Sequence, residues 1–411
     1  MTGPNPLGWP GYEDQLRRAR ERTGGVESVS WRRHGPAVVV AFDFRFLGGS
    51  VGTATGAVVE EAFTEARLAG LPVVSTIATG GSRMQEGMLS LRQLQRVARL
   101  CAEHRAAGLP VVSVLGDPTT GGVWASLGAG ADVVVGVSGA QVGFAGSRVR
   151  PAADHGDPAY TAEGQFAAGT VDVVVRPEEV DATVARVLEV LAGGDAAPAE
   201  VPRALGASDL PRDGWDAVLR ARAPGRPRAD VYLDDYFDGA RVRVSGDRAG
   251  GVDPGMRCGI GTRGGRSIAF AAQTGTANTP AGFRTAARLI RLAERFAIPV
   301  LTLVDTPGAA NDAAAERAGV GAAIADLFAA VAEARVPITT LVVGEGGSGG
   351  ALALSSPEHT WITPDAYFSV IAPELAASIL KRDDVPRLAD DLRLRPQDLV
   401  ELGVVRGIAE R

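Results

Sequence analysis

Four glycine-bearing turns are the parts of this sequence whose residue types could take part directly in chemistry. Two of them hold glycine pairs, Gly121-Gly122 and Gly349-Gly350, and each pair opens a stretch of small apolar residues. Glycine has no Cβ, so a backbone N–H there can closely approach a negative oxygen, and unpaired N–H groups at a helix start favour an anion. Each pair is therefore a candidate oxyanion-hole donor.

Two earlier turns could supply the opposing donors. A single glycine turn is weak evidence, because glycine more often serves a tight turn or close helix packing. Two such turns in each half, at matched spacing, favour catalysis, although duplication of a structural turn would leave the same pattern. We assign these turns to substrate binding; their residues are Gly80, Gly81, Ser82, Arg83, Gly308 and Ala309.

An internal repeat positions these turns. Pro72 and Pro110 are 38 residues apart, as are Pro299 and Pro337, and each proline is followed by a short apolar run. The second glycine of each pair follows its proline by 12 residues in the first half and 13 in the second. The chain therefore resembles one fold written twice.

The elements between the turns indicate an α/β fold. The apolar runs are continuous and rich in β-branched residues, which is typical of strands covered on both faces. Residues 89–105 and 321–334 have apolar side chains at helical spacing. The repeating unit is therefore strand, glycine turn, helix, strand, glycine pair and helix.

The repeat predicts two domains. We place the first at residues 1–195 and the second at 206–411. A helix is expected at 178–191, followed by a linker rich in Ala, Gly and Pro at 192–211.

Composition narrows the class of protein. A net charge of −6 without a basic cluster argues against a nucleic-acid partner. Cys101 and Cys258 are the two cysteines, and their separation excludes a disulfide framework or a cysteine-ligated metal, so no metal site is expected and both should be buried. Without a secretory pattern or an apolar run of about 18 residues, we expect a cytoplasmic protein with no membrane partner.

Longer motifs carry a resemblance to a known family. The chain is similar to the bacterial acetyl-CoA carboxylase carboxyltransferase, with its beta-type and alpha-type subunits joined end to end. The resemblance covers roughly residues 30–175 and 225–410. The matching runs are 44–52, 79–86, 117–123 and 143–146 in the first half and 246–248, 305–309, 344–351 and 367–371 in the second.

The resemblance implies two tandem crotonase-like domains of ββα spiral type. It implies transfer of a carboxyl group from carboxybiotin, held on a separate carrier protein, to the α-carbon of an acyl-CoA. One oxyanion hole would hold the thioester enolate, with Gly121 and Gly122, and the other the ureido oxygen of biotin, with Gly349 and Gly350. The resemblance also implies that biotin itself takes up the α-proton once its CO2 has left. A side-chain base is then not required, which agrees with the absence of His from the glycine turns.

The same resemblance implies partners. They are a biotin carboxylase, a biotin carboxyl carrier protein and further copies of this chain, in a homodimer or a larger ring. Active sites in the family form between the first half of one copy and the second half of another.

Charged residues near the turns have structural interpretations too. Arg83 could contact a CoA phosphate or position its turn. We interpret Glu86 and Glu316 as ion-pair residues of modest energetic value, and Asp117 and Asp305 as turn caps.

Departures from the family pattern leave other functions open. The chain lacks the cysteine zinc ribbon of the beta-type subunit, and it has Ala310-Asn311-Asp312 where the alpha-type subunit has Tyr-Pro-Gly. Other departures are Ser147, Ala372 and a short segment at 148–160. One alternative is a biotin-independent decarboxylase of malonyl thioesters in secondary metabolism, which would keep the first oxyanion hole. Another is a non-catalytic carboxylase scaffold, which should tolerate decay of the glycine pairs.

Overall fold

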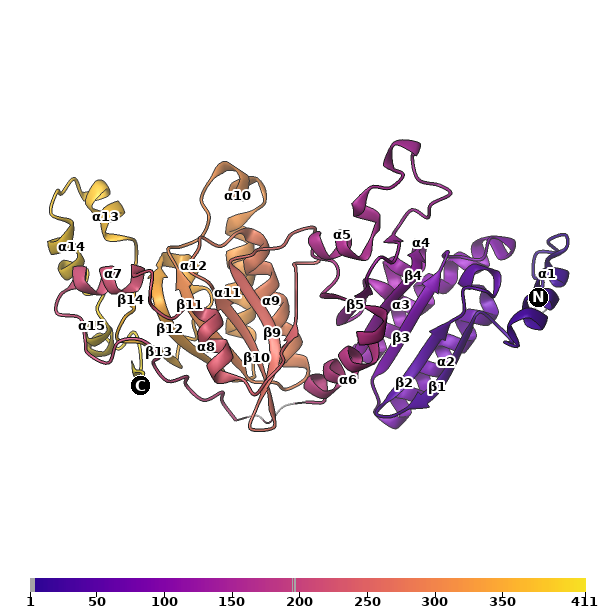
Figure 1. The fold of residues 1–411 in the computed structure, drawn as a ribbon, viewed down its shortest axis with the longest axis horizontal. Coiled ribbons are helices and arrows are strands. Elements are labelled where there is room, and N and C mark those ends of the chain that lie inside the picture. The colour runs from indigo at the N-terminus through magenta and orange to yellow at the C-terminus, as the bar shows by residue number, and fades with distance from the viewer. Residues whose placement is uncertain (1–3, 194, 196) are drawn as a thin grey trace. The chain divides into compact units, whose positions relative to one another are not determined.

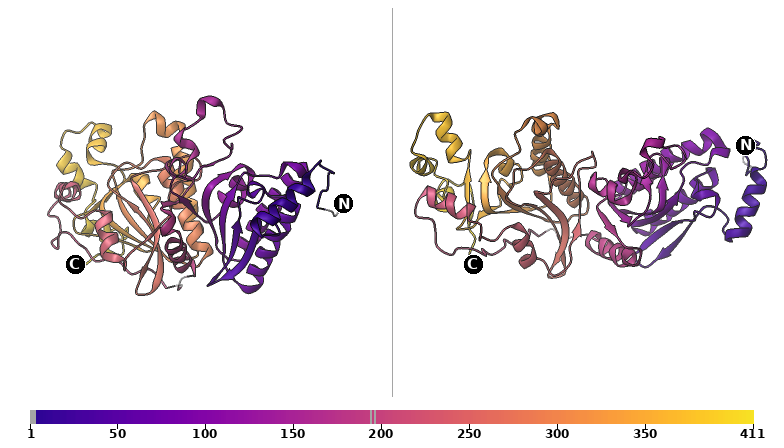
Figure 2. Two further views of the ribbon diagram at one scale, coloured as in Figure 1. Left: turned by 45° about the vertical axis from the view of Figure 1, so that its right-hand side comes forward. Right: turned by 45° about the horizontal axis from the view of Figure 1, so that its top comes forward.

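The chain divides into two compact units. The computed structural model describes residues 4–193, 195 and 197–411. Unit 1 spans Met1–Leu191 and unit 2 spans Ala192–Arg411. Each unit is built around one sheet, and Figures 1 and 2 show the strands of each unit running together with helices packed beside them.

Unit 1 contains a mixed sheet that begins with an antiparallel hairpin. Within the described residues its strand order is β1-β2-β3-β4-β5-β7, with β6 paired to the end of β4. The strands from β2 onward run parallel to one another. The bounds are Val29–His34 for β1, Ala37–Phe42 for β2, Val73–Thr79 for β3, Val111–Thr120 for β4, Val133–Val137 for β5, Val142–Gly143 for β6 and Val173–Val175 for β7.

Unit 2 repeats this arrangement and adds one edge strand. Its order over the described residues is β15-β13-β12-β11-β10-β9-β8, with β14 paired to the end of β12. The hairpin β9–β10 corresponds to β1–β2, and each later strand has a counterpart with the same pairing. The bounds are Val242–Arg243 for β8, Met256–Arg263 for β9, Arg266–Gln273 for β10, Val300–Thr306 for β11, Ile338–Gly347 for β12, Thr360–Ile362 for β13, Tyr367–Ser369 for β14 and Gly407–Ile408 for β15.

Long helices cover the sheets and follow the repeat. They are α2 (Thr53–Ala69) and α3 (Gly87–Ala106) in unit 1, and α9 (Pro280–Arg295) and α11 (Val320–Glu333) in unit 2. In unit 2 a further helix, α8 (Ala229–Tyr236), packs on the opposite face from α9 and α11 (Figure 1). The strands are therefore buried on both faces, as their continuous apolar pattern predicts.

The other helices are shorter. Apart from the two short helices at the glycine pairs, they include α1 (Tyr12–Thr23), α5 (Ala162–Ala167), α6 (Val180–Leu191), α7 (Gly214–Arg222), α10 (Ala313–Arg317), α13 (Pro373–Leu380), α14 (Val385–Asp391) and α15 (Pro396–Glu401). The helices predicted at 89–105, 178–191 and 321–334 are confirmed as α3, α6 and α11, with ends shifted by one or two residues.

The segment predicted as a linker is partly built into unit 2. Ala199 and Ala204 lie in the core that contains α8, and Ala204 N–H donates to the carbonyl of Glu410 at 2.7 Å. Their small apolar side chains fit in this core, so the part of the segment around residues 199–205 is packed on unit 2. Positions 194 and 196 of the predicted linker lie outside the described residues.

Several predictions from composition can be compared with the fold. Cys101 and Cys258 are free and buried, as expected. No helix over the described ranges is long and apolar enough to cross a membrane. The same part of the chain holds no cluster of three or more His, Cys, Asp or Glu side chains able to bind a metal ion.

The buried His104 makes unit 1 sensitive to acid. It is fully buried at the end of α3, where its ring meets Phe63 edge-on at 5.4 Å. Burial, together with the nearby charge of Arg67, lowers the pKa of His104 to about 4. An unfolded histidine protonates near about 6.5, so the unfolded state gains protons first and stability falls as the pH drops from about 6.5 towards 4. We expect His104→Leu to lose less thermal stability than the parent chain between pH 7 and pH 5, and an equal loss in both would contradict this assignment.

Candidate active site

In unit 1 the two glycine turns meet backbone to backbone. Gly80 and Gly81 follow β3, and Gly121 leads from β4 into the short helix α4 (Gly121–Val123). A methyl group on Gly81 would lie 3.4 Å from the Gly121 Cα and 3.8 Å from the Gly122 nitrogen. Gly81 and Gly121 have φ values of 104° and 70°, which L side chains rarely adopt. The structure thus brings together the turns that the sequence predicts to face each other.

Three of the predicted amides in this turn pair are already engaged. Gly80 N–H donates to the Gly48 carbonyl at 2.8 Å, and Gly121 N–H donates to the Phe144 carbonyl at 3.1 Å. Gly81 N–H donates to the Thr79 hydroxyl at 3.0 Å. These amides hold the turns in shape, so they are not the groups that can receive a substrate oxygen.

The Ser82 and Gly122 amides remain open. Val51 N–H donates to the Gly81 carbonyl and Arg83 N–H donates to the Val51 carbonyl, each at 2.9 Å. This parallel bridge turns the Ser82 amide away from Val51. Over the described residues neither the Ser82 nor the Gly122 N–H has an acceptor. The first candidate oxyanion hole is therefore formed by these two donors.

The matching turn in unit 2 is built in the same way. Gly308 N–H donates to the Thr306 hydroxyl at 3.1 Å, as Gly81 does to Thr79. Asn278 N–H donates to the Gly308 carbonyl at 3.2 Å, and Ala310 N–H donates to the Asn278 carbonyl at 2.8 Å. Among the residues that the structure describes, the Ala309 N–H has no acceptor, and Ala309 pairs with Asn278 as Ser82 pairs with Val51 in unit 1.

Strand pairing shows which residues of the two glycine pairs correspond to each other. Thr79 pairs with Thr119 in unit 1 and Thr306 pairs with Gly346 in unit 2, each after a bulge. Counting onward from these partners, Gly122 corresponds to Gly349. The glycine pairs are thus offset by one residue between the copies, in keeping with the spacings of 12 and 13 residues from their prolines.

Ser348 is consequently the counterpart of Gly121. It begins α12 (Ser348–Leu352) with a φ of 56°, close to the 70° of Gly121. A left-handed serine costs free energy, and such strain commonly marks functional sites. Because Gly121 and Ser348 share this left-handed backbone conformation, we infer that both short helices must begin with it.

Gly349 and Gly350 differ in their surroundings. No other group lies within 4 Å of the place where a Cβ on Gly349 would be, so the space beside its Cα is open. A Cβ on Gly350 would lie 2.5 Å from the Ala309 nitrogen, so Gly350 is needed for packing between the turns. In this part of the described chain neither amide has an acceptor.

Helix dipoles contribute less than the sequence suggests. The helix α4 has three residues and continues into a π-helical turn at Trp124–Gly128, and α12 has five residues. A macrodipole needs a longer run of aligned peptides. The preference of these sites for an anion therefore rests on the free N–H groups.

Arg83 is not placed to contact a CoA phosphate. Its side chain is 1% exposed and forms an ion pair with Glu27 at 2.6 Å. Because its side chain is buried, Arg83 fits only the second of its two predicted roles, which is to position the turn. Glu86 forms the expected ion pair, with Arg83 at 3.8 Å, but it is buried rather than at a surface. Glu316 is exposed on α10 and forms no ion pair within the described ranges.

Asp305 is more than the turn cap that the sequence predicts. Its carboxylate is fully buried and pairs with Arg226 at 2.6 Å and Arg228 at 3.3 Å, just before the turn at Thr306. Asp117 is exposed and accepts a hydrogen bond from Gln141 N–H at 2.9 Å, in keeping with a turn role. Sequence reasoning missed both arginines, since neither belongs to the four glycine turns that it singled out.

A surface hollow lies elsewhere in unit 2, at the β9–β10 hairpin. Its lining includes Glu200, Asp238, Arg263 and Arg266. It contains none of the predicted site residues, and its mixed charges are satisfied locally, as in the Arg263–Glu200 pair. The glycine turns therefore remain the candidate site.

Comparisons with known proteins find relatives that match both units. A model described as a carboxyl transferase domain matches residues 15–193, and one described as acetyl co-enzyme A carboxylase carboxyltransferase-like matches residues 210–411. A relative from Saccharopolyspora erythraea, named acetyl-coenzyme A carboxylase carboxyl transferase subunits beta/alpha, is 41% identical over 97% of this chain and 74% of its own length. A Mycobacterium bovis protein named as a probable biotin-dependent acyl-coenzyme A carboxylase beta3 subunit is 32% identical over 96% of this chain and 82% of its own length.

Solved structures show the same fold. A transcarboxylase 12S structure, described as a hexamer assembly with methylmalonyl-coenzyme A bound, superposes with a TM-score of 0.77. It is 22% identical and the match covers 93% of this chain and 78% of that one. A single-chain long-chain acyl-CoA carboxylase gives a TM-score of 0.73 at 22% identity, over 91% of this chain and 38% of that one.

The fold is thus that of a tandem pair of carboxyltransferase domains, and the predicted α/β architecture with two crotonase-like copies is confirmed. The chain belongs to the family of acetyl-coenzyme A carboxylase carboxyl transferase subunits beta/alpha, the carboxyltransferase component of such carboxylases.

Proposed function

We propose that this chain transfers a carboxyl group from carboxybiotin, held on a separate carrier protein, to the α-carbon of an acyl-CoA. The observation that carries the proposal is the pair of free backbone amides on facing turns, present once in each unit and built on the same strand register. Two acceptor oxygens must be held in this reaction, the thioester oxygen and the ureido oxygen, so two such sites are needed.

Unit 1 would hold the acyl thioester. As the α-carbon loses its proton, negative charge develops on the thioester oxygen, and the Ser82 and Gly122 amides would stabilise it. Donors that are already fixed by the surrounding hydrogen bonds need no reorganisation when the charge appears, which is the main advantage of an oxyanion hole. Of the residues first assigned to this site, Gly80, Gly81 and Gly121 then shape the turns.

Unit 2 fits the ureido oxygen of biotin. The Ala309 and Gly349 amides lack protein acceptors over the described chain, and the space in front of Gly349 is open. A neutral or partly charged carbonyl oxygen suits such donors, because it accepts hydrogen bonds without needing a countercharge. When bound, carboxybiotin supplies the carboxyl group, and Gly308 and Gly350 hold the turns that present the two donors.

The two domains and the partners form part of the same proposal. Residues 1–195 would be the beta-subunit-like domain and 206–411 the alpha-subunit-like domain. A biotin carboxylase would recharge the carrier protein, and copies of this chain would associate as a dimer or a larger ring. Size measurement on dilution, with activity followed in parallel, tests this association.

Malonyl-CoA consumption tests the reaction class. The purified chain is incubated with malonyl-CoA, with and without a biotinylated carrier protein, and the thioester product is identified by mass spectrometry. We expect conversion to acetyl-CoA that depends on biotin. Equal conversion without biotin would establish the decarboxylase alternative, whose retained second set of free amides would then have no explanation.

A further inference from the structure

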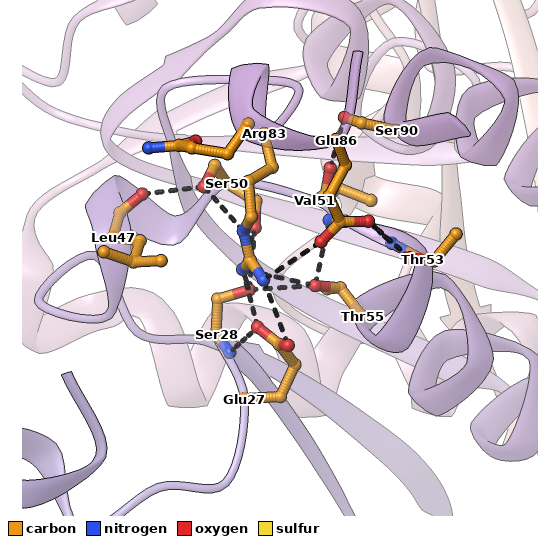
Figure 3. A network of polar contacts seen from close by, with 12 residues as sticks. Glu27, Ser28, Leu47, Ser50, Val51, Thr53, Thr55, Arg83, Glu86 and Ser90 are labelled. Atoms are coloured by element: carbon orange, nitrogen blue, oxygen red, sulfur yellow. Dashed lines mark hydrogen bonds and ion pairs between the residues drawn. The ribbon is translucent and has the colours of Figure 1, made fainter. Parts of the chain in front are cut away.

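A buried polar network adjoins the turn that carries the Ser82 amide of the first candidate oxyanion hole. Its centre is Arg83, the residue after Ser82, and Figure 3 shows its guanidinium enclosed on several sides. The guanidinium donates to both carboxylate oxygens of Glu27, at 2.6 and 3.0 Å. It also donates to the Ser50 carbonyl at 2.6 Å and to the Ser50 hydroxyl at 3.2 Å. One side chain therefore joins the segment before β1 to the loop after β2.

That loop sets the direction of the Ser82 amide. Ser50 directly precedes Val51, and Val51 bonds to the backbone on both sides of Ser82. The Thr79 hydroxyl donates to the Gly49 carbonyl at 2.7 Å, and Gly80 N–H donates to the Gly48 carbonyl. A displacement of the loop would consequently be passed to the Ser82 N–H.

The N-terminal helix α1 reaches the same network through Tyr12. The buried Tyr12 hydroxyl donates to the Glu86 carboxylate at 2.7 Å and accepts from Arg83 Nη1 at 3.3 Å. The second oxygen of Glu86 accepts from Thr53 N–H at 2.6 Å, at the start of α2. The tyrosine therefore fixes both the cation and the second carboxylate.

Stability alone does not explain a buried ion pair of this kind. Taking a guanidinium and a carboxylate out of water is costly, and apolar replacements of similar volume are often neutral or stabilising. Burial alone would raise the pKa of Glu27, but the hydrogen bonds and charge of Arg83, together with hydrogen bonds from Ser28 N–H and Thr55, lower that pKa overall. Glu27 is charged at neutral pH, and the bidentate geometry gives the pair a fixed direction.

We propose that Arg83 is a positioning residue that fixes the Ser82 amide of the first oxyanion hole, and that Tyr12 acts through it. The inference rests on the proposed function of unit 1. It makes α1 part of the support of the site, although α1 contributes no residue to the site itself.

The test compares Arg83→Lys and Tyr12→Phe with the matched control Arg99→Met. Arg99 lies on α3 with an 80% exposed side chain, where it pairs with Glu103 at 2.6 Å. A lysine keeps the charge but cannot span Glu27 and the Ser50 carbonyl together. Displacing a donor by about 1 Å can cost about 100-fold in rate. We expect kcat to fall about tenfold or more for Arg83→Lys and severalfold for Tyr12→Phe, with little change in KM for malonyl-CoA. Arg99→Met should leave both kcat and KM unchanged.

Infrared spectroscopy of bound acetyl-CoA, labelled at its thioester carbonyl, supplies a readout that partial unfolding would not move. In the parent chain the oxyanion hole should shift the carbonyl stretch to lower frequency, and both variants should move it back towards the free value. A shift in the parent chain that both variants retain would overturn the role of Arg83 while leaving the proposed function intact. No shift in the parent chain would instead overturn the assignment of unit 1 to the thioester, and the inference with it. If Arg83→Lys fails to fold, Tyr12→Phe, which removes one hydroxyl, decides the matter.

Discussion

Gly349→Ala should lower the biotin-dependent reaction about 100-fold without lowering the melting temperature. The added methyl group meets no atom within 4 Å and the glycine has no positive φ, so the fold accepts alanine. Alanine in a helix is favoured over glycine by about 0.5–1 kcal/mol, so stability should hold or rise slightly. The methyl group would, however, stand in the open space through which an oxygen must approach the amide. Losing an oxyanion-hole donor typically costs 100-fold or more in kcat.

The matched control for that variant is Gly321→Ala in α11. Gly321 is also a helical glycine with no atom within 4 Å of an added Cβ, and it lies outside both glycine turns. It should keep full activity with an equal or higher melting temperature. Full biotin-dependent activity in Gly349→Ala would show that this amide does not receive the ureido oxygen.

Asp305→Asn should destabilise unit 2 by about 3–5 kcal/mol, since removing one partner of a buried ion pair leaves the other charge uncompensated. Asp305 is fully buried, and Arg226, its main partner, has a side chain only 3% exposed. Asparagine has nearly the same shape, so the loss would report charge rather than volume. Chemical denaturation followed by circular dichroism measures the change, with the two units expected to unfold in separate transitions.

An exposed ion pair in the same unit gives the control. Asp326 pairs with Arg291 at 2.5 Å, with both side chains at least 42% exposed. Exposed pairs contribute about 0–1 kcal/mol, so Asp326→Asn should change stability little. Equal losses in the two variants would mean that the Asp305 pair has no special role beneath the second turn.

The repeated architecture could be predicted from the sequence because it depends on short-range patterns. The spacing of Pro72, Pro110, Pro299 and Pro337 marks the start of matching strands, and helical spacing marks α3 and α11. Glycine turns after buried strands indicated the candidate site. These patterns can be recognised without any knowledge of contacts between segments that are distant in sequence.

The identity of the donor amides could not be predicted in this way. Gly121 and Gly122 are neighbours with the same residue type, yet one amide bonds to Phe144 and the other is free. That difference depends on the pairing of β4 with β6, which is a contact between segments. Thr79 and Thr306 each stand two residues before a glycine. This shared pattern could have indicated which glycine amides are engaged, but sequence reasoning missed it.

The supporting ion pairs were beyond sequence reasoning for a similar reason. Glu27 and Arg83 are 56 residues apart, and Arg226 and Asp305 are 79 residues apart. The two copies also support their turns differently, with Arg83 beneath the first and Asn278 bonded to the buried Asp253 beside the second. A repeat detected in sequence gives no information on such differences between its copies.

The most direct test of the central claim is to follow the carboxyl group itself. Malonyl-CoA labelled with heavy carbon in its free carboxyl group is incubated with the chain and a biotinylated carrier protein, and the intact carrier is weighed by mass spectrometry. If the chain is a carboxyltransferase, labelled carboxyl should appear on the carrier in step with acetyl-CoA, and Gly349→Ala should slow both together. Release of acetyl-CoA at an equal rate with no label ever reaching the carrier, whether or not biotin is present, would contradict the account.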